Sequence, residues 1–407
     1  MSNGITFVIQ PGGLGRRLPG SDYISGLIFQ FPVGEAPTGI IDGVKGVKVS
    51  SLEEAENLGI VSTSANDSVK ILHYHVTEFF RIYEGKTQSI GDLWLKGVEA
   101  AIVEQDFIDL QTAANGTIKQ IAVYNDVPFA ASIVTTANAA ADTLLANKQP
   151  AVIIVTGDFT GFSDLSTLPD VRALDQDYVS VDFSQDGSGA GKALFDSVGK
   201  TVSGIGTVLG TIAAAAVNLN IGWRAQFNIA GVEEYQEPAT GEGTTYDDLT
   251  VSEEASLQTK GYIFAQKETG LSGAYYYDSP QTVPVDSDFA YIENTRTIFK
   301  AIREINQRIL PFQNAPIIVD AVTGKITEET IFELESVVFQ GLNELARNGE
   351  IAVDQTTQKL PQTSVFIDPD QNVLSTSVVN ITVRIVPTGV QRETKFNIGF
   401  TPKIQGN

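Results

Sequence analysis

The chain has 407 residues, 42% of them hydrophobic and 19% charged, which is enough for two or three folded domains and is not a composition typical of disorder. Its formal net charge of −22 argues against nucleic acid or an anionic membrane as a partner, and no apolar run approaches the ~18 residues of a membrane span. The absence of cysteine excludes disulfides and thiolate chemistry, and two histidines leave few metal ligands or general bases.

The first 20 residues are predicted to form a strand and a linker. Residues 4–10 alternate in polarity, with Ile5, Phe7 and Ile9 on one side, which is typical of a half-buried strand. Residues 11–20 are rich in glycine and proline, so they cannot continue that strand.

Residues 21–117 are predicted to be a mixed α/β region. We expect a short strand over residues 70–83 and a helix over residues 90–104. His73 and His75 lie on that expected strand, where both imidazoles would point to one side and could contribute to a metal site. Because no third histidine exists, a hydrogen-bonded surface pair is the favoured interpretation.

Residues 118–290 are predicted to form an α/β domain. Apolar, β-branched segments of strand length alternate with helical segments, a pattern typical of a largely parallel sheet covered by helices. The expected strands are 120–124, 151–156 and 178–183, and the expected helices lie in 136–148 and 190–217. Residues 238–254 are acidic and rich in glycine and threonine, and are predicted to be a solvated loop.

Residues 291–407 are predicted to form an α+β domain. A helix over residues 292–310 ends at Pro311, and a second helix begins after Thr327 and ends at Asn348 and Gly349. The residues expected on their buried faces are Ile298, Ile302, Ile305 and Ile309 in the first helix and Ile331, Leu334, Val338, Leu342 and Leu345 in the second.

Two alternating segments follow these helices. Residues 378–386 and residues 394–401 each have the pattern of a half-buried strand. Their apolar positions are Val379, Ile381, Val383 and Ile385 in the first and Phe396, Ile398 and Phe400 in the second. The predicted fold is therefore α/β plus α+β, a mixed sheet flanked by helices with strand-like extensions at both chain ends.

One stretch, DGSGAGKA at residues 186–193, approaches a phosphate-binding loop. That loop needs a glycine where this chain has Asp186 and a serine or threonine where it has Ala193. At residues 199–201 the Lys-Thr pair is present, but Leu194 stands at the position of the first glycine. We therefore expect a strand-to-helix turn, no nucleotide or other cofactor, and no enzyme activity.

Three basic residues lie close together on one predicted helix, although the chain as a whole is acidic. Arg296, Lys300 and Arg303 are spaced i, i+4 and i+7 on the helix predicted over residues 292–310, so they lie in a narrow sector. They could dock an acidic partner, or they could pair with Glu293 and Glu304 on a solvated face.

The order of several short passages resembles the contractile tail sheath family of phages and related injection systems. The passages are GTVLG at 206–210, VNLNIG at 217–222, GYIF at 261–264, GLSGAYYY at 270–277 and DFAYI at 288–292, followed by the Arg-bearing helix, the helix over 326–349 and the terminal strands. The likeness is strongest after residue 200, and the chain is short for that family.

This resemblance implies a sheath subunit with a C-terminal sheath-core domain. Such subunits stack as hexameric rings around an inner tube, join baseplate and tail terminator proteins, and contract by rigid-body rotation without consuming nucleotide. They belong to a virion tail or a phage-tail-like particle that assembles in the bacterial host cytoplasm. In that setting Arg296, Lys300 and Arg303 would face the tube.

The chain ends are expected to be exchanged between neighbouring subunits. Strands at 5–10 and 394–401 would add to the 378–386 edge of a neighbour and satisfy its unpaired backbone groups. An ordinary hairpin across residues 387–389 is the alternative. Two other functions stay open at this point: another self-assembling tail or baseplate protein, and a cytosolic enzyme that uses carboxylates.

Overall fold

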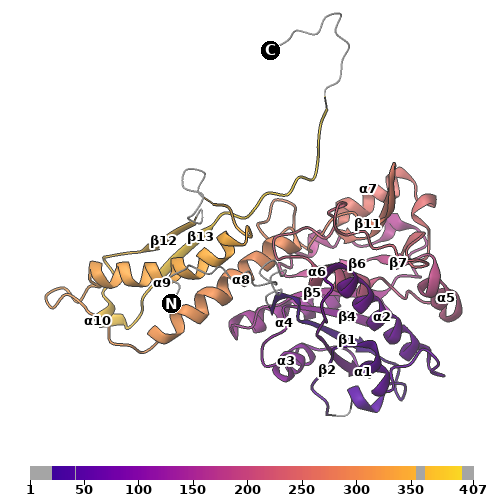
Figure 1. The fold of residues 1–407 in the computed structure, drawn as a ribbon, viewed down its shortest axis with the longest axis horizontal. Coiled ribbons are helices and arrows are strands. Elements are labelled where there is room, and N and C mark those ends of the chain that lie inside the picture. Colours follow the sequence, from indigo (N-terminus) through magenta and orange to yellow (C-terminus); the bar gives the residue numbers. More distant parts are fainter. Residues whose placement is uncertain (1–20, 42, 354–362, 397–407) are drawn as a thin grey trace, which may run out of the picture.

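The computed structural model describes residues 21–41, 43–353 and 363–396 (Figure 1). Residues 21–291 build a large N-terminal domain around one sheet. The chain then continues into a smaller domain of two long helices and a two-stranded sheet, which projects to one side (Figure 1). The predicted class, a mixed sheet with helices plus an α+β unit, is confirmed.

The N-terminal domain is built on a seven-stranded sheet in the order β2-β3-β1-β4-β5-β6-β9. Every neighbouring pair is parallel except β2 with β3, which is antiparallel. The strands are β1 (Ser25–Gln30), β2 (Val47–Val49), β3 (Leu93–Val98), β4 (Gln120–Pro128), β5 (Val152–Asp158), β6 (Val179–Asp182) and β9 (Tyr262–Ile263).

Both faces of this sheet are buried, because alternate residues of each strand enter different cores. Leu27 and Phe29 of β1 and Tyr124 of β4 face one core, whereas Ile28 and Val123 face the other. The first core includes side chains of α2 (Asp67–Thr87) and α6 (Ile205–Ala214), and the second includes those of α3 (Glu104–Ala113) and α4 (Ala131–Ala146). The result is a three-layer sandwich of helices, sheet and helices.

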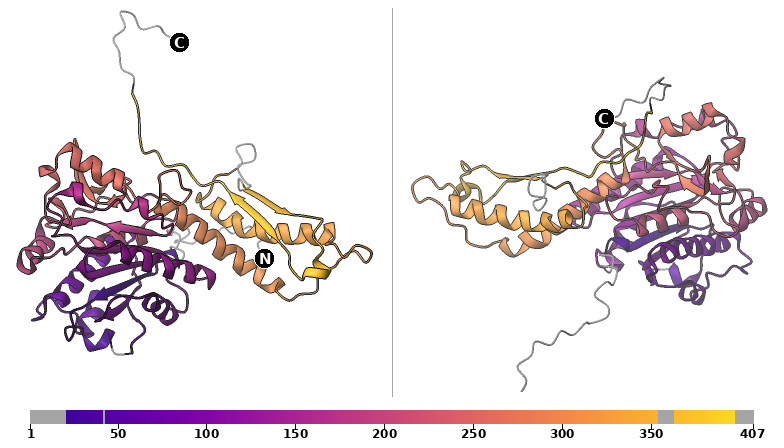
Figure 2. Two further views of the ribbon diagram at one scale, coloured as in Figure 1. Left: turned by 180° about the vertical axis from the view of Figure 1, so that it is seen from behind. Right: turned by 45° about the horizontal axis from the view of Figure 1, so that its top comes forward.

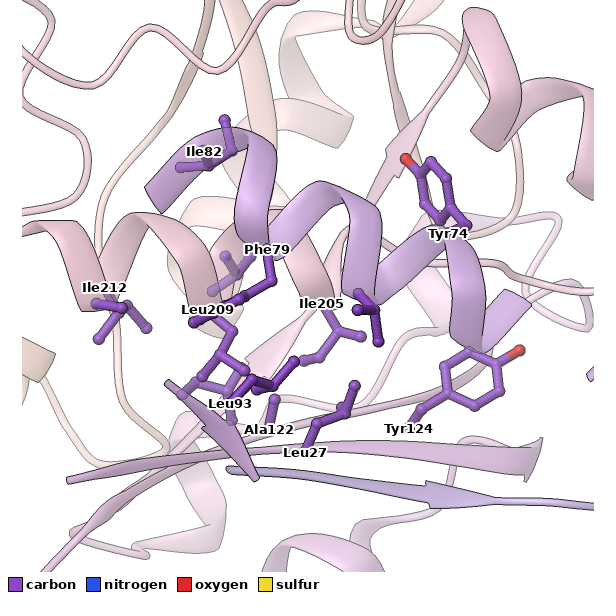
Figure 3. Packing of buried hydrophobic residues seen from close by; sticks show 14 of the residues in the cluster. Leu27, Tyr74, Phe79, Ile82, Leu93, Ala122, Tyr124, Ile205, Leu209 and Ile212 are labelled. Carbon is purple, nitrogen blue, oxygen red and sulfur yellow. The ribbon is translucent and has the colours of Figure 1, made fainter. Parts of the chain in front are cut away.

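Helices α2 and α6 pack closely above the sheet, and Figure 3 shows their apolar side chains meeting those of the strands. Two glycines of α6 permit this approach. A Cβ at Gly206 would lie 2.7 Å from the Cα of His75, and one at Gly210 would lie 2.8 Å from the carbonyl oxygen of Phe79. The GTVLG passage is therefore a close helix–helix contact.

Shorter elements complete the N-terminal domain. Two antiparallel pairs lie beside the main sheet: β7 (Ser184–Asp186) with β8 (Pro238–Thr240), and β10 (Ala265–Glu268) with β11 (Leu271–Tyr276). The remaining helices are α1 (Leu52–Asn57), α5 (Gly189–Val198) and α7 (Val251–Lys260), with 3₁₀ turns η1 (Ser21–Tyr23), η2 (Thr38–Ile40), η3 (Leu165–Thr167), η4 (Arg172–Leu174) and η5 (Tyr246–Asp248).

The structure corrects two predictions in the region 21–117. Residues 70–83 are not a strand but the middle of α2, since their apolar residues also recur at helical spacing and pack against α6. Residues 90–104 are not a helix: β3 occupies their centre, and α3 begins only at Glu104. Strand β3 lies between β1 and β2 and is buried on both faces, which hides the alternation that would have identified it.

Two further predictions change. Residues 238–254 are not one solvated loop, because β8 is buried and Thr250 caps α7 by accepting a hydrogen bond from the backbone of Glu253. The boundary predicted between residues 117 and 118 falls inside the main sheet, since β1 pairs with β4. By contrast, the strands and helices predicted within 118–217 are present as β4, α4, β5, β6, α5 and α6.

The C-terminal domain begins within α8 (Ile292–Ile309), which is followed by η6 (Leu310–Phe312). The first half of α8 contributes Ile292 and Phe299 to the N-terminal core, and its second half places Ala301 and Ile305 in the core of the smaller domain. Ile298, expected on the buried face, belongs to neither core. Helix α9 (Glu328–Arg347) runs beside α8 and is capped by Thr327 as predicted (Figure 1). Since α8 packs into both cores, it connects the two domains.

Candidate assembly interface

The smaller domain carries a two-stranded sheet formed by β12 (Thr363–Ile367) and β13 (Ile381–Ile385), with α10 (Val373–Thr376) between them. The strands are antiparallel, and Val365 faces Val383 while Ile367 faces Ile381. These side chains pack on the α8–α9 layer, whereas the residues between them point outward. The alternation predicted for the second strand is therefore present, over a shorter range than 378–386.

Each strand of this sheet has a single strand neighbour among the described residues. Past β13, the pairing seen in the described segments is a bridge between Ile351 and Pro387 and a hydrogen bond from the Ala352 amide to the Val386 carbonyl, 2.9 Å long. On the outward face, Phe366 of β12 is 58% exposed. A sheet with open edges and an exposed aromatic residue is a surface suited to the addition of another strand.

The part of the chain described after β13 does not fold back on this strand. Residues 388–396 form no strand in the described part of the chain; they run toward the N-terminal domain and then away from it (Figure 2). Phe396, near the end of the described segment, is 79% exposed. The hairpin across residues 387–389, considered as an alternative from the sequence, is therefore absent from these residues. We call residues 388–396 the C-terminal arm.

The structure describes only some of the residues predicted to pair between subunits. Ile381, Val383 and Ile385 share the inner face of β13, and Val379 precedes the strand and packs against the core of the smaller domain. Phe396 is in the arm and not in a strand. The others lie outside the described residues: Ile5, Phe7, Ile9, Ile398 and Phe400. Exchange of these segments stays a prediction.

The three cations of α8 are engaged within the chain. Arg296 is 3% exposed, and its guanidinium donates to the carbonyl oxygens of Ala215 at 3.1 Å and Ala216 at 3.4 Å, at the end of α6. Lys300 pairs with Asp22 at 2.7 Å and with Glu350 at 2.6 Å, and Arg303 pairs with Asp22 at 2.8 Å.

These partners differ from both expectations, a docking stripe and pairs with Glu293 and Glu304. The ion pairs of Lys300 and Arg303 with Asp22 instead join α8 to η1 at the start of the N-terminal domain. Contact of Arg296, Lys300 and Arg303 with a tube stays a prediction, and it would require these side chains to leave their present partners.

Burial sets the electrostatics of this cluster. Burial alone would raise the pKa of Asp22, but Lys300 and the two arginines hold that pKa below its ordinary value. Burial lowers the pKa of Arg296 to about 10, which leaves its guanidinium charged at neutral pH. Burial also raises the pKa of the Glu350 carboxyl, against the opposing effect of Lys300. The ionised Asp22 therefore compensates the buried cations.

A second polar contact, which the sequence did not suggest, holds the C-terminal arm. Arg392 donates from Nε to Asp278 at 2.8 Å and from Nη2 to Glu293 at 2.5 Å. Its guanidinium carbon lies 3.4 Å from the centroid of the Tyr291 ring. The only available signal was the adjacency of Tyr291 and Glu293 at the start of a predicted helix, and nothing local connects them to Arg392.

The histidine pair does not form a site. On a helix, residues two apart point in different directions, so the imidazoles of His73 and His75 diverge. His73 pairs with Glu56 at 3.0 Å, whereas His75 is fully buried beside Phe29 and Tyr124. Burial lowers the pKa of His75 to about 3.

The loop-like stretch at 186–193 is the strand-to-helix turn predicted from the sequence. Asp186 ends β7 and accepts hydrogen bonds from the backbone amides of Ser188 at 3.0 Å and Tyr235 at 2.8 Å. Lys192 pairs with Asp196 on its own helix. Within residues 21–41, 43–353 and 363–396, no group of three His, Asp or Glu side chains is arranged to hold a metal ion, and no helix combines the length and apolarity needed to cross a bilayer.

Comparison with protein families covers nearly the whole chain. None of the curated proteins compared with it matches. Residues 2–280 match the model of the DUF2586 N-terminal domain, and residues 288–405 match that of the DUF2586 C-terminal domain. The division between the two models falls just before α8, the helix that connects the two domains of the structure. The chain belongs to the DUF2586 family.

Proposed function

We propose that this protein is the sheath subunit of a contractile tail or injection system, a structural protein that polymerises with copies of itself. The observation that carries the proposal is the open-edged β12–β13 sheet beside a chain end that leaves its own domain as an extended arm. An exposed sheet edge and an extended strand from another copy complement each other through main-chain hydrogen bonds. The resemblance of the passages after residue 200 to sheath proteins supports the same function.

In this proposal the subunits form stacked hexameric rings around an inner tube, between a baseplate and a tail terminator protein. Strands from neighbouring copies, at residues 5–10 and 394–401, pair with the β12–β13 sheet and keep the subunits linked. The N-terminal domains then rotate as rigid bodies during contraction in the tail of a virion or a phage-tail-like particle. The work is stored in subunit contacts, so no nucleotide or catalytic residue takes part.

Electron microscopy of the purified protein tests the proposal. The full chain should polymerise into hollow cylinders. A chain lacking residues 397–407 keeps Arg392 and its contacts but loses most of the predicted strand, so it should give folded monomers. Ile398→Asp combined with Phe400→Asp should have the same effect.

Val251→Asp is the matched control, because Val251 is 84% exposed on the N-terminal domain, far along the chain from the strands. It should assemble as the unmodified chain does. Cylinders formed equally well by the truncated chain would refute strand exchange through this end. Discrete particles from the full chain under all assembly conditions would refute the sheath function.

A further inference from the structure

The C-terminal arm is held by a pre-arranged set of acidic and aromatic groups. Glu293 lies in the first turn of α8 with its side chain 2% exposed, and Asp278 follows β11 with its side chain 13% exposed. The ring of Tyr291 lies under the arginine that these carboxylates bind. Two carboxylates and one ring therefore surround a single guanidinium, the geometry favoured for arginine recognition.

Neighbouring polar groups orient the two carboxylates. The Asn220 amide donates to Glu293 at 3.2 Å and also to Asp278, and the Ser279 hydroxyl donates to Glu293. The Ser279 backbone amide donates to Asp278 at 2.8 Å. These groups are uncharged, so the positive charge that balances the pair comes from Arg392. Without that arginine, a nearly buried carboxylate would face a second one with no cation between them.

Little else attaches the arm to the N-terminal domain. A groove of about 1120 Å³ is lined on one side by residues 388–393 and on the other by residues that include Trp223 and Tyr277. Apart from Arg392, whose side chain is 31% exposed, residues 391–396 are exposed. Val390 is half-buried, and nearer β13 the Asn218 amide donates to Thr388 at 3.0 Å. Since apolar burial in the arm is limited to this one valine, the arginine contact is the main attachment.

We propose that Asp278, Tyr291 and Glu293 form an arginine-binding socket for Arg392 that keeps the arm from pairing with β13 of its own subunit. A hairpin would need residues 391–396 to reverse alongside β13, whereas the socket fixes Arg392 on the N-terminal domain. The arm then projects from the N-terminal domain, and its backbone N–H and C=O groups are available to pair with a strand of a second copy. This last step rests on the proposed function, but the binding of Arg392 by the socket does not.

Distance measurement between two spin labels tests the socket in the full chain. The sequence has no cysteine, so Thr382→Cys on β13 and Lys395→Cys on the arm introduce unique labelling sites. With Arg392 present, the labels should be far apart. In Arg392→Ala the fraction of chains with closely spaced labels should rise about tenfold, because hydrogen bonds to charged groups shift such equilibria by at least that factor.

Asp278→Asn, which removes a carboxylate of the socket, should raise the fraction of closely spaced labels in the same way. Arg392→Lys should give a fraction between those of the unmodified chain and Arg392→Ala, because lysine keeps the charge but lacks the planar guanidinium. Lys325→Ala, which removes an exposed ion pair with Asp370, is the control and should leave the distances unchanged. Identical distance distributions in Arg392→Ala and the unmodified chain would overturn the proposal. The labelled chain is diluted into unlabelled chain and measured below the protein concentration at which cylinders form, so that only distances within one monomer are recorded. The test therefore stands whether or not the full chain assembles.

Discussion

Asp22 and Lys300 form a 2.7 Å ion pair that joins the beginning of the N-terminal domain to the helix leading into the C-terminal domain. Both side chains are largely buried, at 19% and 11% exposure. Arg303 shares the same carboxylate, and Glu350 shares the same ammonium. The relative position of the two domains therefore depends on this cluster as well as on the apolar packing of α8.

Asp22→Asn is expected to weaken the attachment of α8 to the N-terminal domain. The loss should fall between the about 1 kcal/mol of an exposed ion pair and the about 3–5 kcal/mol of a buried one that loses a partner. Urea denaturation measures the change in unfolding free energy. Asp67→Asn, which removes an exposed pair with Lys70, is the control. Equal effects of the two substitutions would show that the Asp22 cluster has no special role.

Arg296→Met is expected to destabilise the fold and not merely to weaken assembly. The methionine fills part of the same volume but leaves the buried Ala215 carbonyl without its side-chain donor, whereas the Ala216 carbonyl still accepts from the Leu219 amide. An unsatisfied buried group costs about 1–3 kcal/mol. Thermal unfolding followed by circular dichroism would detect this as a lower midpoint. An unchanged midpoint together with failed assembly would instead favour the docking role predicted from the sequence.

Gly206→Ala should destabilise the N-terminal domain by about 2 kcal/mol or more, because its new Cβ would press on the His75 backbone of α2. Gly85→Ala is the matched control, a glycine in α2 itself with no atom near the position of a new Cβ. That change should stabilise the protein by about 0.5–1 kcal/mol through helix propensity. Chemical denaturation of both variants distinguishes the steric cost from the intrinsic preference.

His75→Phe should improve stability in acid. The folded-state pKa of His75 is lowered from 6.5 to about 3, so between these values the unfolded chain binds a proton that the folded chain excludes. The unmodified chain therefore keeps the whole stabilisation from neutral His75 above pH 6.5. As the pH decreases from 6.5 towards 3, its unfolding free energy decreases by about 1.4 kcal/mol per pH unit. Urea titrations at pH 7, 6, 5 and 4 should show a shallower decline for the variant. Parallel curves would contradict the buried, neutral state of His75.

The local sequence pattern was sufficient to predict a helix or strand where the spacing of the apolar residues matched the face or faces that the segment buries. Helix α9 could be predicted because its apolar residues keep one helical period over its whole length and it begins at a cap. The parallel strands β4 to β6 could be predicted because each is an apolar, β-branched run of strand length. The alternation of Ile381, Val383 and Ile385 likewise identified β13. The α2 segment could not be assigned this way, because its many apolar and aromatic residues fit a strand as well as a helix until α6 packs against it.

The class of the fold and the positions of α9 and β13 could be read from the sequence, since these depend on residues close together in the chain. Which charges meet was settled only by the packing of the two domains. Asp22 reaches Lys300, and Arg392 reaches Asp278 and Glu293, because domain packing brings distant segments together and buries them. A charged side chain that becomes buried needs an oppositely charged partner or hydrogen bonds. The local sequence around that side chain does not predict which distant segment supplies the partner.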